Sequence, residues 1–105
     1  MDSNIYLIFD KISGRVATPM FMPNHASAVR ECATMLARLD PMALNDFELY
    51  FVGTFSSECE DEASIFDSIS LLDSSQVENL SSRVHEYFAR FNKNYKGVIH
   101  EKENG

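Results

Sequence analysis

The first 22 residues contain two apolar runs separated by a polar turn, and this pattern restricts what the chain can form. The first run, NIYLIF at residues 4–9, is apolar at every position after Asn4, which is typical of a strand covered on both faces. The turn DKISGR contains Gly14, which can adopt a positive φ. Pro19 lies in the second run, residues 16–22, and proline cannot donate to a neighbouring strand. We therefore predict a hairpin whose second strand is an edge strand or is interrupted at Pro19.

A helix and a strand follow this hairpin. Asn24 is a favourable N-cap, and apolar residues recur at helical spacing as far as Leu39. FELYFVGTF, residues 47–55, is aromatic and β-branched, which predicts the clearest strand of the chain. Gly53 is a candidate bulge position within it.

The second half of the chain predicts a loop, a short strand and a long helix. Residues 56–63 are acidic and serine-rich, which indicates a loop, and SIFDSISLL, residues 64–72, is a candidate fourth strand. SSQVENLSSRVHEYFARFNKNY, residues 74–95, carries one apolar stripe at helical spacing. Ser75 and Glu78 fit a capping box at the start of this helix.

The order β-β-α-β-(β)-α predicts an α+β fold in which a small antiparallel sheet has two helices packed on one face. A chain of 105 residues can form one modest core, so we expect a single domain over residues 1–97 and a frayed tail over residues 98–105. No apolar stretch approaches the roughly 18–20 residues that span a bilayer, and the start MDSN does not resemble a signal peptide. We expect no membrane association and a cytoplasmic location.

The residues that usually carry catalysis do not form a recognisable constellation. His25, His85 and His100 lack the spacing of a metal-binding motif, and His25 reads as a surface or capping residue. Cys32 falls on the apolar stripe of the first helix, where cysteine acts as a small hydrophobe. Cys59 lies among acidic residues, which disfavour a reactive thiolate. We expect a protein that acts by binding, with no enzymatic activity, cofactor or metal.

Charge is distributed unevenly along the chain. The net charge of −7 opposes general affinity for nucleic-acid backbones, yet residues 83–96 are basic and alternate cations with aromatic rings. Single-stranded nucleic acids are bound by this combination, because cations contact phosphates and rings stack on bases. The alternative is that the aromatic residues are core and the bases a solvated helix face. With two cations of the hairpin turn, the candidate nucleic-acid ligands are Lys11, Arg15, Arg83, Tyr87, Arg90, Lys93, Tyr95 and Lys96.

The acidic segment SSECEDEAS, residues 56–64, is a second candidate surface. It lacks the residue order of a calcium-binding loop, so it is either a solvated loop or a docking site for a basic partner protein. The candidate partner-binding residues are Glu58, Glu60, Asp61 and Glu62. An interrupted edge strand on a small domain also favours homo-oligomers, since assembly completes the core.

The first half of the chain resembles the small nonstructural protein of gokushovirus-like microviruses, phages with circular single-stranded DNA genomes. The resemblance rests on the order and spacing of Phe9-Asp10, Pro19, Phe21, Ala28, Arg30, Asp46-Phe47, Leu49-Tyr50, Val52-Gly53 and Phe55. It implies a nonvirion accessory factor that binds DNA or acts in the switch between genome replication and packaging, with no catalytic residues. The longer acidic segment and the C-terminal helix depart from the family pattern and leave the second half unassigned.

Two functions therefore remain open. The first is a phage accessory protein in the host cytoplasm that binds single-stranded DNA through residues 83–96. The second is an adaptor or inhibitor that engages a host or viral protein through its acidic loop.

Overall fold

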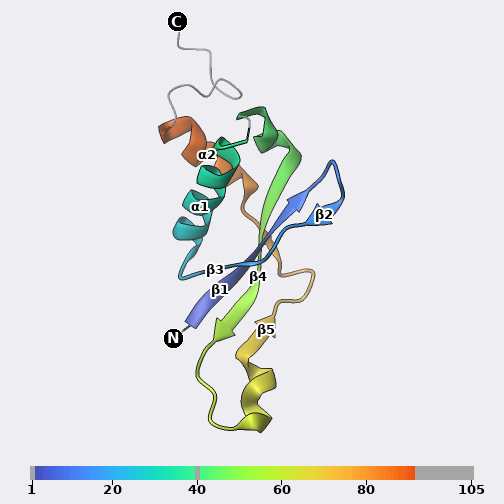
Figure 1. The fold of residues 1–105 in the computed structure, drawn as a ribbon, viewed down its shortest axis with the longest axis vertical. Helices are drawn as coiled ribbons and strands as arrows, with labels where there is room; N and C mark the ends of the chain where they lie inside the picture. The colour runs from blue at the N-terminus through green and yellow to red at the C-terminus, as the bar shows by residue number, and fades with distance from the viewer. Residues whose placement is uncertain (1, 40, 92–105) are drawn as a thin grey trace, which may run out of the picture.

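A computed structural model describes residues 2–39 and 41–91 of the chain, and Figure 1 shows their arrangement. Six strands, two α-helices and two 3₁₀ helices alternate along this part of the chain. Their order is β1 (Asp2–Asp10), β2 (Arg15–Val16), β3 (Met20–Met22), α1 (His25–Ala37), η1 (Pro41–Asp46), β4 (Phe47–Ser56), η2 (Glu62–Ser68), β5 (Ile69–Leu71), β6 (Glu78–Asn79) and α2 (Ser81–Phe91).

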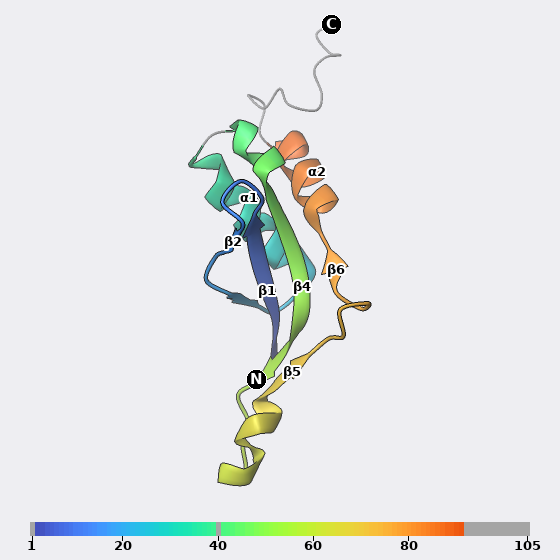
Figure 2. The same ribbon diagram turned by 90° about the vertical axis from the view of Figure 1, so that its right-hand side faces the viewer.

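The strands form one antiparallel sheet around the long pair β1 and β4. β2 and β3 both pair with β1, whereas β5 and β6 both pair with β4. Both α-helices lie on the same side of this sheet, as Figures 1 and 2 show together. The predicted α+β fold, with an antiparallel sheet and two helices on one face, is confirmed.

The N-terminal hairpin forms as the residue pattern predicts. Gly14 adopts a φ of 72° in the turn, where Gly14 N donates to Asp10 O at 2.8 Å. The return strand is split into β2 and β3, and Pro19 lies in the gap between them. Pro19 therefore marks the interruption because it has no N–H for the ladder.

A bulge lies where β1 and β4 cross the middle of the sheet. Ile5 pairs with Gly53, whereas the next residue, Tyr6, pairs with Phe51. Val52 is therefore the extra residue, directly beside the glycine at which the sequence predicts a bulge. Because of this extra residue, odd-numbered side chains of β4 point to one face of the sheet before Val52 and to the other face after it.

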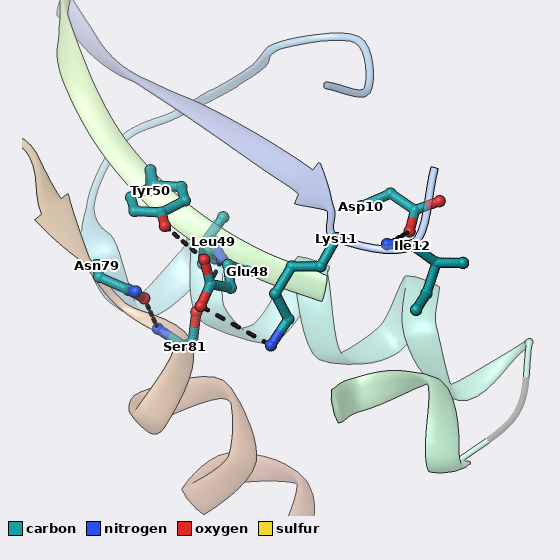
Figure 3. A network of polar contacts seen from close by, with 8 residues as sticks. All are labelled: Asp10, Lys11, Ile12, Glu48, Leu49, Tyr50, Asn79 and Ser81. Carbon is teal, nitrogen blue, oxygen red and sulfur yellow. Dashed lines mark hydrogen bonds and ion pairs between the residues drawn. The ribbon is translucent and has the colours of Figure 1, made fainter. Parts of the chain in front are cut away.

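The predicted long helix begins later than its residue pattern suggests. Residues 74–80 are not helical: Glu78 lies in β6 and pairs with Phe51, so the predicted Ser75–Glu78 capping box is wrong. The competing interaction is with β4, since Leu80 N donates to Leu49 O at 2.7 Å. Figure 3 shows the actual start of α2, where Asn79 Oδ1 accepts from Ser81 N at 2.9 Å.

The candidate fourth strand at residues 64–72 is only partly a strand. Its first residues belong to η2, and the strand is limited to β5, Ile69–Leu71. The Asp61 side chain begins η2, because Asp61 Oδ1 accepts from Ser64 N at 3.1 Å and Ser64 Oγ bonds to Asp61 N. This local capping box favours a helical turn over an extended chain.

The core lies between the sheet and the two helices. Tyr6, Ile8 and Leu49 contribute from the strands, and their side chains are fully or almost fully buried. The helices contribute Ala28, Val29, Cys32, Ala33, Leu36, Val84 and Phe88. No described helix covers the second face of β1 (Figure 2), yet Ile5 on that face is buried, as is Tyr6 on the helix side, so the prediction of cover on both faces holds at the middle of the strand.

Gly53 is required for the contact between β4 and β5. A Cβ at this position would lie 2.5 Å from Ser70 O, which is backbone and cannot move aside alone. We expect Gly53→Ala to lower the free energy of unfolding by about 1–3 kcal/mol, as overpacking usually does. Urea denaturation measures this, with the exposed neighbour variant Thr54→Ala as control, expected to lose less than about 1 kcal/mol. Equal losses in both variants would contradict the steric explanation.

The two thiols differ in environment and should differ in reactivity. Burial raises the pKa of Cys32 to about 12, whereas Cys59 is exposed. We expect the folded protein to react with a thiol reagent at Cys59 alone, and the denatured protein to react at both cysteines. A colorimetric thiol titration before and after denaturation checks this, and rapid modification of Cys32 in the folded protein would contradict the packing described above.

Candidate functional site

A groove of about 440 Å³ lies between the first half of α1 and the exposed face of α2. Its lining residues come from these two helices and the cap of α1: Asn24, Ala26, Ser27, Val29, Arg30, Arg83, Glu86, Tyr87 and Arg90. We call it the α1–α2 groove.

The charge of the α1–α2 groove is opposite to that of the whole protein. Three arginines and one glutamate line it, although the chain carries a net charge of −7. Arg30, Arg83 and Arg90 are exposed, and Tyr87 is half-buried between the helices. Guanidinium groups donate two parallel hydrogen bonds to a phosphate, so this wall is suited to an anionic ligand.

The N-terminal turn of α1 adds to the positive electrostatic potential of the groove. Asn24 Oδ1 accepts from Ser27 N at 2.8 Å and holds the beginning of the helix at the edge of the groove. The first turn of α1 contains no acidic residue. The positive end of the helix dipole therefore adds to the field of the arginines.

Three predicted nucleic-acid ligands come together here. Arg83, Tyr87 and Arg90 lie on α2 at spacings of four and three residues, which places them on one helix face. Arg30 was not among the predicted ligands and joins them from α1. Its only sequence signal is its place in the pattern of the microvirus resemblance.

The other predicted cations lie elsewhere. Lys11 lies on the β1–β2 turn and Arg15 begins β2, both outside the α1–α2 groove, and Lys11 Nζ lies 4.0 Å from Glu48 Oε2 (Figure 3). Lys93, Tyr95 and Lys96 lie outside the described residues.

The predicted partner-binding acids lie far from the groove. These residues are exposed, and the segment that carries them lies at the end of the molecule opposite α1 and α2 (Figure 1): Glu58, Glu60, Asp61 and Glu62. Asp61 is also engaged as the cap of η2, so part of the acidic composition is structural.

A half-buried polar contact that the sequence pattern does not reveal lies at the first residue of α1, next to Asn24. The Tyr6 hydroxyl accepts from Asn4 Nδ2 at 2.9 Å and lies 2.7 Å from His25 Nδ1. His25 Nε2 lies 3.5 Å from Glu78 Oε1, and the imidazole packs on the Phe51 ring with a centroid distance of 4.7 Å. The phenol oxygen can also accept a second hydrogen bond, so the imidazole tautomer decides whether Tyr6 donates to Nδ1 or accepts from it.

This contact holds the beginning of α1 against the sheet. Burial raises the pKa of Tyr6, so the phenol stays neutral and can donate to His25. The prediction that His25 is a capping-region residue agrees with its position as the first residue of α1. Its role here is to join α1, β1 and β6 next to Asn24, which lines the groove.

Within the described ranges, three or more His, Cys, Asp or Glu side chains nowhere gather as a metal site would require. The same part of the chain holds no helix with the length and apolar character needed to cross a bilayer.

The Tyr6 hydroxyl should contribute measurably to stability. Tyr6→Phe leaves Asn4 and His25 without their partner in a half-buried place, so we expect a loss of about 1–2 kcal/mol in the free energy of unfolding. Tyr50→Phe is the matched control, because Tyr50 also donates to a side chain, Glu48 (Figure 3), but is itself partly exposed whereas Tyr6 is fully buried, so its removal should cost less than about 0.5 kcal/mol. Urea denaturation compares the two, and equal losses would contradict a special role for Tyr6.

Comparison with known proteins identifies one family. The model of the family described as "Phage ORF5 protein" matches residues 3–69. No curated protein and no solved structure matches the chain significantly. Since the family match covers more than half of the 105 residues, the chain belongs to the phage ORF5 protein family.

Proposed function

We propose that this phage protein is a non-enzymatic accessory protein that binds single-stranded DNA in the α1–α2 groove during genome replication or packaging in the host cytoplasm. The observation that carries the proposal is the convergence of Arg30, Arg83 and Arg90 beside Tyr87 on an otherwise acidic protein. Membership of a phage family supports a role in infection. The resemblance of the first half to microvirus proteins supports a single-stranded DNA genome as the context.

The residues of the groove suit a single strand better than a duplex. The arginines offer bidentate hydrogen bonds to phosphates. The Tyr87 ring packs partly against the core, and the part of it that lines the groove can stack on an unpaired base. In a duplex the bases are already stacked on one another and do not reach such a ring. Glu86 in the same groove opposes a continuous phosphate track, which favours a short contact over a long wrapped strand.

The affinity for single-stranded DNA should depend on salt concentration to an extent set by the number of arginines in the groove. If three arginines contact phosphates of a single strand, a plot of the logarithm of the association constant against the logarithm of the salt concentration should have a slope of about −2. Affinity should therefore fall about 20-fold between about 50 and about 200 mM salt.

Fluorescence anisotropy of labelled single-stranded and duplex oligonucleotides tests the proposal. We expect salt-dependent binding that favours the single strand and weakens about tenfold or more when Arg83→Glu and Arg90→Glu are combined. Arg38→Glu is the control, because Arg38 caps the opposite end of α1 and lies outside the groove.

Two results would reject this function. One is no binding at tens of micromolar protein, and the other is equal weakening by Arg38→Glu. Either result would favour the adaptor alternative, in which the acidic loop engages a host or viral protein through Glu58, Glu60, Asp61 and Glu62. Reversal of the charges in that loop would then abolish binding of the partner protein.

A further inference from the structure

Glu86 is the only acidic side chain among the described residues that line the α1–α2 groove. It is exposed and lies at the rim of the groove, since it also borders a second hollow with Ser82, His85 and Ala89. Glu86 forms neither an ion pair nor a side-chain hydrogen bond with any residue that the structure describes. Its carboxylate oxygens are therefore available to a ligand in the groove.

The pair Glu86 and Tyr87 has an arginine about one helical turn to each side. Arg83 precedes Glu86 by three residues and Arg90 follows it by four, spacings that place side chains on one helix face. At about 1.5 Å per residue, Arg83 and Arg90 are about 10.5 Å apart along the axis of α2. A strand that runs along α2 can therefore contact both arginines through its phosphates while one base lies between them.

The base between the two arginines meets a ring and a carboxylate. Tyr87 offers the part of its ring that lines the groove for stacking, and the ionised carboxylate of Glu86 only accepts hydrogen bonds. The base edge that faces Glu86 must therefore present donors.

Guanine is the base whose edge fits a carboxylate best. Its Watson–Crick edge carries two adjacent donors, N1–H and N2–H, which match the two oxygens of one carboxylate. Thymine presents one N–H between two carbonyl oxygens, and these oxygens are repelled by a carboxylate. Adenine and cytosine each present one amino group beside a ring nitrogen that accepts hydrogen bonds.

We propose that Glu86 makes the α1–α2 groove selective for guanine in a single strand. N1–H and N2–H of the base donate to the carboxylate, while Arg83 and Arg90 bind the phosphates on either side. This inference rests on the proposed function and names the base that the groove favours. In a duplex both N–H groups are already paired with cytosine, so selection by Glu86 requires an unpaired strand.

Fluorescence anisotropy with labelled thymidine pentanucleotides, whose central base is guanine, cytosine, adenine or thymine, tests the proposal. We expect the guanine strand to bind about 5- to 10-fold more tightly than the all-thymine strand, the lower part of the range for a bidentate contact, because Glu86 is exposed. Hypoxanthine in place of guanine lacks the N2 amino group and should remove most of this preference. That substitution tests the contact without any change to the protein.

Glu86→Ala should reduce the difference between the guanine and thymine strands to less than about twofold. Its affinity for the thymine strand should be equal or higher, because the carboxylate no longer repels the phosphates. Glu31→Ala is the matched control: Glu31 is exposed on α1 outside the groove, carries the same charge, and its loss should leave the preference unchanged. Free dGMP should compete at least about tenfold less well than the guanine strand, because it lacks the second phosphate contact.

Three results would overturn the inference: equal binding of the four strands, a guanine preference that persists in Glu86→Ala, or competition by dGMP as strong as by the guanine strand. Equal binding that still depends on Arg83 and Arg90 would leave the proposed function intact. A failure to bind any single strand would reject both the selectivity and the proposed function.

Discussion

β1 and β4 pair from Asp2 opposite Ser56 to Asp10 opposite Phe47, and each remaining strand is hydrogen-bonded to one of these two. The pairing decides which side chains meet the helices, because antiparallel partners share a face. It also determines where α2 begins, since Leu49 N donates to Ser81 Oγ at 3.0 Å while Leu49 O accepts from Leu80 N. The position of the α1–α2 groove thus depends on the middle of β4.

The elements that the sequence predicts well are those with local causes. The split at Pro19, the cap at Asn24 and the aromatic strand β4 each follow from the conformational preferences of neighbouring residues. The start of α2 does not follow from such preferences, because residues 74–80 have a helical pattern of their own. Pairing of Glu78 and Asn79 with β4 overrides that pattern, and it joins residues far apart in the chain.

The same distinction holds for the site. Arg83, Tyr87 and Arg90 can be grouped from their spacing on one helix, whereas Arg30 reaches them only through the packing of α1 on α2. Lys11 and Arg15 share the sign of these arginines but lie on the N-terminal hairpin, so charge alone does not identify the members of a groove. The contact between Tyr6 and His25 is equally non-local and has no short-range signal.

The bulge at Val52 has a consequence for the aromatic side chains of β4. Phe51 and Phe55 are four residues apart and would lie on one face of a regular strand. Because of the extra residue, Phe51 instead points toward the helices and Phe55 toward the face that no described helix covers. A single strand thereby supplies a ring to two separate layers. Deletion of one residue at this point would restore regular alternation along β4, so that Phe51 and Phe55 would point to the same face of the sheet. The other face would then lose its aromatic ring, although the composition of the strand would barely change. The length of β4 is therefore under tighter constraint than the identity of Val52.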